Sequence, residues 1–458
     1  MSKNITNYEN LYELSATEAI KLFSAGKITP SDLIESIITR IKIINPITNA
    51  FIHLNHSRTL GIAKNFDKKL ANNENIGPLF GVPVGIKDIF NSKDFPTEMG
   101  SPLWKDFTPG NDSRVVHYIR SANGLIIGKT ETAEFAVHAL GKSLNPYDPT
   151  RSPGTSSSGS AIAVATSMVP LALGTQTAGS IIRPASYCGI YGFKPSFGLL
   201  PRVGMLKTTD SLDQIGFFAR TPHDLELLFD IIRVKGMNYP LSHKALTDQK
   251  RQTISDRKWR IKFTKSPVWD KADDYTKSAL ENFVKKISSI LNFEIEEYSL
   301  PKEFDSTHYM HQIIYAKSLS YYFKEELKQK NLVSKIFYEF ASKARNISVE
   351  NFDNAIDYQN MITRKLDKEF EKFDIIISLS TATHAPLRNE PEKDDPSLIW
   401  TMCGVPTINV PALKSNESLP LGVQIVARKY NDKLLLNFVK ELYQKDLIKD
   451  GPYPKLKL

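Results

Sequence analysis

The sequence predicts an α/β protein that folds as one unit with a mostly helical insertion. Between about residues 76 and 230, short apolar runs bounded by glycine and proline alternate with amphipathic segments, as is typical of strands buried on both faces of a sheet. A more polar section with helical spacing follows at about 236–372, and apolar runs return at 373–458. Because strand-rich segments lie on both sides of the helical section, one interrupted domain over 1–458 is favoured over independent domains.

The first 75 residues are predicted to form amphipathic helices. Ser15 and Glu18 make a capping box at the start of a helix over 16–25, because a serine three residues before a glutamate satisfies free N–H groups at a helix N-terminus. A second helix is predicted to begin at Thr29, with apolar residues spaced for one buried face. Asn45-Pro46 is expected to end it, since proline lacks the N–H that continues a helix.

The remaining elements are assigned from apolar runs, which predict strands, and from helical spacing. The predicted strands are Val82–Ile86, Leu125–Gly128, Val169–Gly174, Gly189–Phe193, Asp213–Arg220, Asp374–Leu379 and Gly422–Ala427. The predicted helices are Ser113–Ala122, Tyr321–Lys330, Ser334–Ala344 and Asp432–Tyr443.

The chain of 458 residues carries a formal net charge of +9. Such a charge could favour anionic partners, nucleic acid included. However, the sequence contains no block of five or more basic residues and no signature of RNA or DNA binding. A lysine-rich surface in contact with water is the favoured interpretation, and nucleic acid is not an expected partner.

The two cysteines, Cys188 and Cys403, lie far apart and outside any metal-binding spacing. Neither a disulfide framework nor a zinc site is expected, and a reducing compartment fits. The polar N-terminus lacks the layout of a signal peptide. The longest apolar stretch, 161–174, is interrupted by polar residues and is too short to span a bilayer. A cytoplasmic protein without a membrane span is therefore expected.

Lys87 follows an apolar run and is the first residue whose surroundings suggest chemistry. A lysine at the end of a buried strand has its pKa lowered by burial, and a neutral amine can act as a general base. The alternative is that Lys87 extends to solvent and pairs with Asp88. This segment alone favours that alternative.

Two further segments combine small and hydroxyl-bearing residues. Ser152–Ser160 precedes an apolar helix and offers several hydroxyls and free N–H groups. A helix cap with a flexible loop or a phosphate-binding turn are alternatives, although a P-loop ending and a Gly-x-Ser-x-Gly elbow are both missing from the sequence. Thr177-Ala178-Gly179-Ser180 follows another apolar run. Successive N–H groups there could converge on one oxygen as an oxyanion hole, or the segment could be a simple strand-to-helix turn.

Taken together, these three segments resemble the amidase signature family. The two serines of that family stand twenty-four positions apart, and Ser156 and Ser180 have this separation, while Lys87 lies in a family-like Gly-Val-Pro-Val-x-x-Lys-Asp. The likeness covers most of the chain and is weakest between about 236 and 370. Further matching motifs are Gly128-Lys-Thr130, Asn145-Pro146, Cys188-Gly189, Gly192–Ser196, Ser211–Asp213, Gly404–Pro406 and Leu419–Gln424.

The resemblance implies a large mixed central sheet covered by helices on both faces, and a Ser–cis-Ser–Lys triad. Ser180 would be the nucleophile, Ser156 the bridging serine after a cis Thr155–Ser156 bond, and Lys87 the base. Backbone N–H groups of Thr177, Ala178, Gly179 and Ser180 would hold the oxyanion. Ser157, Asp213 and Arg183 would support the site.

The chain also departs from the commoner family pattern. Ala178 stands where glycine is usual, so we expect a negative φ there. Thr155 replaces a glycine, and Arg183 stands three residues after Ser180 where many members place an arginine two after. These changes leave the triad in place.

The activity implied is hydrolysis of a small-molecule amide to carboxylate and amine through an acyl-enzyme on Ser180, without metal or cofactor. Many relatives are homodimers, so a homodimer is one expectation. Two alternatives stay open: the A subunit of a tRNA-dependent glutamyl/aspartyl amidotransferase, and a non-catalytic binding or scaffold protein on the same fold. The Gln176-Thr-Ala turn and Ser378-Leu-Ser-Thr argue against the former.

Some residues outside these motifs are candidates for lining a pocket. His308 and His311 share a helical face near Tyr315 and could line one, but ordinary packing or exposure is the default interpretation. Trp400 could line an acyl pocket, although core packing is favoured.

Overall fold

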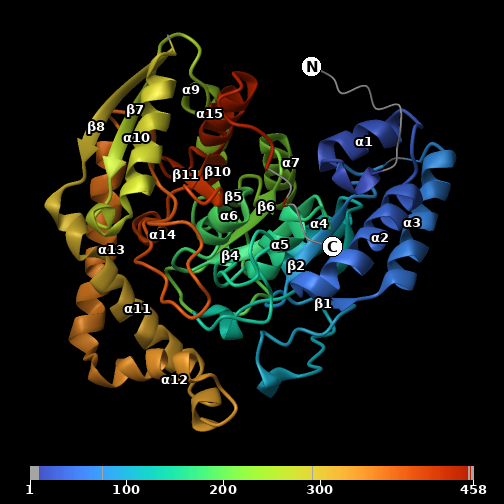
Figure 1. Cartoon of the computed structure of the whole chain (residues 1–458), viewed down its shortest axis with the longest axis horizontal. Coiled ribbons are helices and arrows are strands. Elements are labelled where there is room, and N and C mark those ends of the chain that lie inside the picture. Colours follow the sequence, from blue (N-terminus) through green and yellow to red (C-terminus); the bar gives the residue numbers. More distant parts are fainter. Residues whose placement is uncertain (1–9, 75, 291, 452–453, 455–458) are drawn as a thin grey trace.

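The computed structural model describes residues 10–74, 76–290, 292–451 and 454, and its centre is one eleven-stranded sheet. Figure 1 places helices α1–α3 at one end of the molecule and α10, α11 and α13 at the other. The strand order is β1-β3-β2-β4-β6-β5-β10-β11-β9-β7-β8. The strands are β1 (Phe51–Leu54), β2 (Pro83–Lys87), β3 (Leu125–Thr130), β4 (Leu171–Gln176), β5 (Tyr191–Lys194), β6 (Gln214–Ala219), β7 (Trp259–Lys265), β8 (Phe293–Ser299), β9 (Ile375–Leu379), β10 (Thr407–Lys414) and β11 (Pro420–Ala427).

The sheet is mixed, as the resemblance implied. Strands β3, β2 and β4 are parallel neighbours, and so are β9, β7 and β8. The strands between these groups pair antiparallel. Because β2 and β4 run in the same direction in adjacent positions, the residues that follow them meet at one edge of the sheet. Lys87 ends β2, and the Thr177–Ser180 segment follows β4.

Both faces of the sheet are buried under helices. In β3, Ile126 belongs to one hydrophobic cluster while Leu125 and Ile127 belong to the other, and β4 alternates in the same way. This alternation follows from the two-residue period of a strand, and it confirms that the apolar runs are strands buried on two sides. The long helices are α2 (Pro30–Thr48), α3 (His56–Ala71), α7 (Pro222–Ile232), α10 (Asp274–Ser288), α11 (Thr307–Tyr322), α13 (Val349–Glu369) and α15 (Asp432–Gln444). The shorter ones are α1 (Ala16–Ser24), α4 (Arg114–Ser121), α5 (Ser158–Ala165), α6 (Ile182–Cys188), α8 (Pro240–Thr247), α9 (Gln249–Gln252), α12 (Lys335–Ser342) and α14 (Leu398–Met402).

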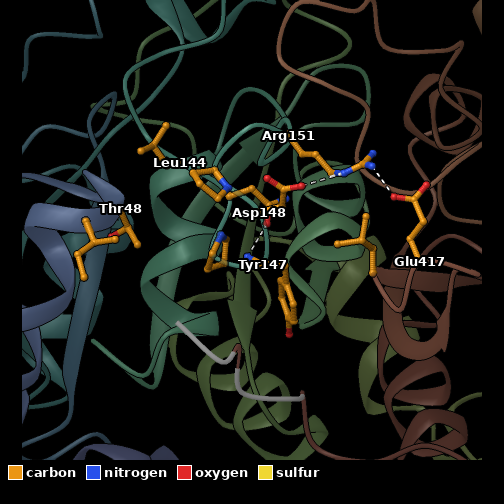
Figure 2. A pocket seen from close by; sticks show the side chains of 11 residues that line it. Thr48, Leu144, Tyr147, Asp148, Arg151 and Glu417 are labelled. Atoms are coloured by element: carbon orange, nitrogen blue, oxygen red, sulfur yellow. Dashed lines mark hydrogen bonds and ion pairs between the residues drawn. The ribbon is translucent and has the colours of Figure 1, made fainter. Parts of the chain in front are cut away.

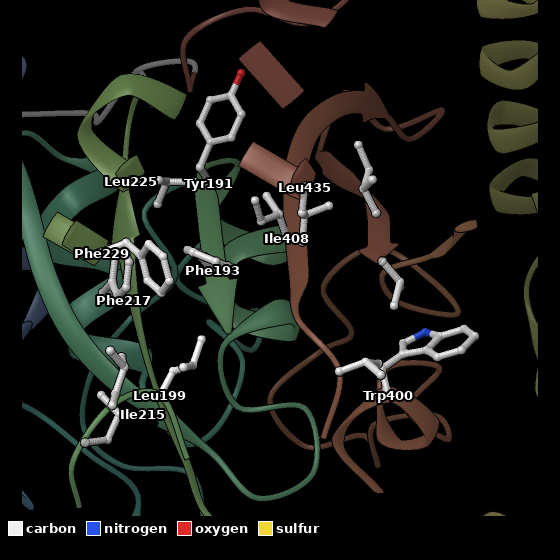
Figure 3. Packing of buried hydrophobic residues seen from close by; sticks show 14 of the residues in the cluster. Tyr191, Phe193, Leu199, Ile215, Phe217, Leu225, Phe229, Trp400, Ile408 and Leu435 are labelled. Atoms are coloured by element: carbon white, nitrogen blue, oxygen red, sulfur yellow. The ribbon is translucent and has the colours of Figure 1, made fainter. Parts of the chain in front are cut away.

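The larger cluster contains Trp400, whose side chain is fully buried (Figure 3). In another part of the same cluster, aromatic rings from neighbouring elements pack together. Phe193 of β5 lies with its ring centroid 5.5 Å from those of Phe217 and Phe229, a separation at which aromatic rings attract one another. Because Trp400 belongs to this cluster and is fully buried, its interpretation as a core residue is confirmed.

The N-terminal helices agree with the sequence except at one end. The predicted capping box of Ser15 and Glu18 is present at α1. The expectation that α2 ends at Asn45-Pro46 is wrong, because the helix continues to Thr48. A proline this close to the end removes only one helical hydrogen bond, and Pro46 itself is exposed. Asn49, with φ of 52°, ends the helix instead.

The section at 236–372 is less uniformly helical than predicted. It contains β7 and β8, which extend the sheet, in addition to helices α8–α13. In β7, buried Trp259 and Ile261 alternate with half-buried Arg260 and Lys262, and β8 is a largely exposed edge strand rich in glutamate. Such a composition hides a strand from propensity rules. The predicted helix Tyr321–Lys330 is also wrong, because α11 ends at Tyr322.

In the part of the chain that the structure describes, no helix is both long enough and apolar enough to cross a membrane.

Candidate active site

Lys87 is completely buried and its amine lies among three hydroxyls. Nζ lies 2.7 Å from Ser156 Oγ, 3.0 Å from Ser157 Oγ and 2.9 Å from Thr175 Oγ1. The alternative in which Lys87 reaches solvent and pairs with Asp88 is wrong. Asp88 instead forms a buried ion pair with Lys129, at 2.8 Å.

The environment of Lys87 favours an uncharged amine. Burial lowers the pKa of Lys87 to about 7, against the opposing effects of the carboxylates of Asp213 and Glu131. A neutral amine has two N–H donors and one lone pair, so one of the three hydroxyls must donate to it. The proton of Ser157 is already committed to the carbonyl of Thr175, 3.1 Å away. Ser157 therefore holds the amine as an acceptor, while Ser156 and Thr175 are free to donate.

Ser156 lies in the hydroxyl-rich loop, two residues before α5 begins. The Thr155–Ser156 peptide bond is cis, as predicted. Arg183 holds the preceding residue, since its guanidinium donates to the carbonyl of Thr155 at 3.0 Å and to the hydroxyl of Thr155 at 3.2 Å. Ser156 itself is buried, so its hydroxyl is available to Lys87 and closed to bulk water.

The segment from Thr177 to Ser180 forms the predicted turn between β4 and α6. Gln176 secures it, because its side-chain oxygen accepts hydrogen bonds from the N–H groups of Ile181 and Ile182, at 2.8 and 3.0 Å. Ala178 is absent from the residues with positive φ, as predicted. At Gly179, a Cβ atom would lie 1.6 Å from Oδ2 of Asp395, so only glycine fits.

Three successive carbonyl groups of this turn are held by hydrogen bonds. His311 Nε2 lies 2.8 Å from the Thr177 oxygen, the Thr401 hydroxyl lies 2.6 Å from the Ala178 oxygen, and the Arg183 N–H lies 2.9 Å from the Gly179 oxygen. A trans peptide directs its N–H away from its carbonyl. The N–H groups of Ala178, Gly179 and Ser180 are thus turned to the other side, and none of them donates to a protein acceptor within the described ranges. Such a group of free donors can hold an anion.

Ser180 is nearly buried, with 8% of its surface exposed. Its hydroxyl makes no hydrogen bond to Ser156 or to Lys87 among the residues that the structure describes. The structure therefore joins Lys87 to Ser156 directly but leaves Ser180 outside this contact. Catalytic hydrogen bonds often close only when substrate binds.

Asp213 holds the turn through hydrogen bonds to its carboxylate. Its carboxylate accepts a hydrogen bond from the Thr177 hydroxyl at 2.8 Å and from the N–H groups of Thr208 and Thr209 at 2.7 and 3.0 Å. It is buried and also acts on Lys87 through its charge. These contacts make Asp213 an anchor for Thr177.

A cavity of about 850 Å³ borders the turn at Ala178 and α6 at Arg183. His308 and His311 line it, so the hypothesis that they line a pocket is confirmed, while His311 is also packed, with 2% of its surface exposed, as the default interpretation held. Sequence reasoning missed two carboxylates that also line it, Glu392 and Asp395, whose oxygens lie 2.7 and 3.4 Å from the Arg183 guanidinium. Their loop carries no motif, and no local pattern indicates that it meets residues two hundred positions earlier.

A second cavity, of about 530 Å³, lies between the end of α2 and residues 144–151, and none of the predicted site residues lines it (Figure 2). Its charged groups satisfy one another, because Arg151 pairs with Asp148 at 3.3 Å and with Glu417 at 2.5 Å. Among the residues that the structure describes, no cluster of histidine, cysteine, aspartate or glutamate could hold a metal ion.

Comparisons with known proteins give a consistent result. The family model described as Amidase matches residues 32–436. A curated relative, the A subunit of glutamyl-tRNA(Gln) amidotransferase from Staphylococcus epidermidis, is 29% identical over 95% of this chain and 96% of its own length. Two solved structures share the fold. One belongs to work on a vestigial protein complex and the evolutionary origins of an s-triazine catabolic enzyme (TM-score 0.86, 24% identity, 96% of this chain and 100% of that one). The other is 6-aminohexanoate cyclic dimer hydrolase complexed with substrate (TM-score 0.83, 22% identity, covering 98% of this chain and 99% of that one).

Proposed function

Because the chain belongs to the amidase family, we propose that it hydrolyses a carbon–nitrogen amide bond to a carboxylate and an amine or ammonia, with Ser180 as the nucleophile. The observation that carries this proposal is the buried Lys87 amine, 2.7 Å from the Ser156 hydroxyl and with a pKa of about 7. It provides a base that is partly uncharged at neutral pH.

In the proposed reaction, the Ser180 oxygen attacks the amide carbonyl and its proton passes to Ser156, while the Ser156 proton passes to neutral Lys87. The carbonyl oxygen becomes an oxyanion, which the N–H groups of the Thr177–Ser180 turn stabilise. The carbon–nitrogen bond then breaks. The leaving nitrogen takes the proton of Ser156, which recovers one from Lys87, and an acyl ester remains on Ser180.

The same groups complete the reaction with water. Water gives one proton to the relay and attacks the acyl ester, the ester oxygen of Ser180 recovers that proton, and the carboxylic acid product leaves and ionises to the carboxylate. Ser157 and Asp213 hold Lys87 and the turn, and Arg183 holds Thr155. This route needs no metal or cofactor.

The substrate is proposed to be a small-molecule amide that binds in the cavity beside Ala178. The lining of this cavity combines charged side chains with apolar ones, among them Arg183, Glu392, Leu140 and Phe340. Both cysteines are free and buried, which supports a reducing compartment such as the cytoplasm.

A second candidate function is the A subunit of a tRNA-dependent amidotransferase. The identity of 29% to a protein of that kind over 95% of this chain favours it. In that case the protein would hydrolyse glutamine and deliver ammonia within a complex. Glutaminase activity that appears only with partner proteins and aminoacyl-tRNA would identify this function, whereas turnover by the isolated chain favours the hydrolase.

The test of the proposal is a screen of small amides with the purified wild-type protein, Ser180→Ala and Ser57→Ala. We expect turnover by the wild type and by the control at the exposed Ser57, and none by Ser180→Ala. A fluorophosphonate probe should label the first two proteins and not the third. A folded wild-type protein that resists labelling would instead favour a non-catalytic scaffold.

A further inference from the structure

His311 comes from α11, more than a hundred residues away in sequence from the turn that it contacts. Its side chain is 2% exposed, and Nε2 lies 2.8 Å from the carbonyl oxygen of Thr177. A carbonyl oxygen can only accept a hydrogen bond, so Nε2 carries the proton. The imidazole also borders the cavity beside Ala178. A side chain that lines the cavity thus donates directly to the backbone of the turn.

This hydrogen bond fixes the orientation of one peptide group. The Thr177–Ala178 bond is not among the cis bonds of the structure, so the N–H of Ala178 points opposite to the carbonyl of Thr177. Rotating the carbonyl away from His311 would rotate this N–H away from its neighbours at Gly179 and Ser180. The next two peptide groups have their own partners, Thr401 and the N–H of Arg183.

We propose that His311 is a positioning residue for the reaction, which holds the Thr177 carbonyl so that the N–H of Ala178 stays aligned with those of Gly179 and Ser180. This inference rests on the proposed role of the turn as an oxyanion hole. It extends the site to a residue from the section where the family motifs are weakest.

His311 does not act as a proton carrier in this role. Burial lowers the pKa of His311 to about 4, against the opposing effect of its hydrogen bond to Thr177, and the charged groups near it include His308 and Asp395. The imidazole is therefore neutral at the pH at which Lys87 works as a base. Replacing His311 should change the rate of the reaction and leave unchanged the pH at which the activity falls on the acid side.

The test compares two substitutions whose expected order depends on the role. His311→Gln keeps an N–H donor at a reach similar to that of Nε2, while His311→Phe keeps the ring that packs against Tyr315 and removes the donor. The main readout is the second-order rate of Ser180 labelling by a fluorophosphonate, whose phosphoryl oxygen occupies the oxyanion hole. Loss of one oxyanion donor lowers the rate roughly 100-fold to 1000-fold, so misorienting one is expected to lower it at least about tenfold.

We expect His311→Phe to be labelled at least about tenfold more slowly than the wild type, and His311→Gln within about threefold of it. Turnover of an amide identified in the screen should follow the same order through kcat, with KM nearly unchanged. If His311 serves packing alone, Ser180 of His311→Phe will be labelled as fast as that of His311→Gln or faster, and this order of rates overturns the proposal. Where His311→Phe does not fold, His311→Met replaces it in the same comparison.

Gln252→Leu is the matched control. Gln252 is also buried, and it also donates to backbone carbonyls, those of Ala245 and Tyr430, at 2.9 and 2.7 Å. Its replacement should lower the melting temperature without slowing the labelling of Ser180. Slowing in this control equal to that in His311→Phe would assign the effect to general destabilisation and overturn the proposal. A wild-type protein that is not labelled at all would instead overturn the proposed function.

Discussion

Replacing Lys87 by methionine should remove the activity and make the protein's stability less dependent on pH. In the unfolded chain this amine keeps its proton up to about pH 10.5, whereas in the folded protein burial lowers its pKa to about 7. Between these values the unfolded state binds more protons, so the stability of the wild type rises with pH. Methionine has a similar length and no proton to lose.

The size of the effect follows from the two pKa values. At about 1.4 kcal/mol for each pKa unit, keeping the amine uncharged in the fold costs about 4 kcal/mol at pH 7 and about 1 kcal/mol at pH 9.5. The stability of Lys87→Met relative to wild type should therefore fall by about 3 kcal/mol between these pH values. The loss of the hydrogen bonds to three hydroxyls lowers the variant's stability by an amount that does not change with pH.

Urea unfolding followed by circular dichroism at pH 7.0 and 9.5 measures this difference for wild type and Lys87→Met. Lys64→Met is the control, because Lys64 is exposed, and its difference from wild type should be the same at both pH values. A stability difference for Lys87→Met that stays constant over this range would refute the assignment of Lys87 as an uncharged buried amine.

The remaining predictions concern activity and the turn. The logarithm of kcat/KM should rise with pH and level off above about pH 7, with kcat/KM at pH 6 about a tenth of its plateau value, since only neutral Lys87 accepts a proton. Lys87→Ala should lack this rise around pH 7 and recover part of its activity only at high pH. A rise around pH 7 that survives in this variant belongs to another group. Gly179→Ala should lower both the melting temperature and the labelling of Ser180, because the new Cβ would lie 1.6 Å from Asp395 Oδ2. Adding Asp395→Ala should restore part of the stability. A melting temperature of Gly179→Ala equal to that of the wild type would contradict this close contact.

The strands that carry the site could be predicted because their signal is local. Each apolar run between glycines reads as a buried strand, and β2 and β4 appear within two residues of their predicted bounds. The burial of Lys87, at the end of such a run, could be predicted once the serine loop and the turn were considered with it. The orientation of Ala178 was also predictable, since it depends on one residue's own backbone preference.

The remainder of the site depends on contacts between distant segments. His311, Asp395 and Thr401 reach the turn from α11, a loop and α14, and nothing in their neighbouring residues indicates that destination. Strand β8 was missed for a related reason. Its glutamates are poor strand formers, and the strand exists because it lies beside β7, where Lys262 and Lys265 face Glu296 and Glu297.

The order of strands in the sheet has a consequence for biosynthesis. Strands β10 and β11, near the C-terminus, lie between β5 and β9 and join the part of the sheet that contains β2 and β4 to the part that contains β7 and β8. A nascent chain that has left the ribosome only as far as β9 holds both serines and the lysine, but its two half-sheets have no strand between them. Thr401, which secures the turn, emerges just before these strands. The protein should therefore be inactive on the ribosome until residues 407–427, which form β10 and β11, have emerged, and a truncation before β10 should yield two open sheet edges prone to aggregation.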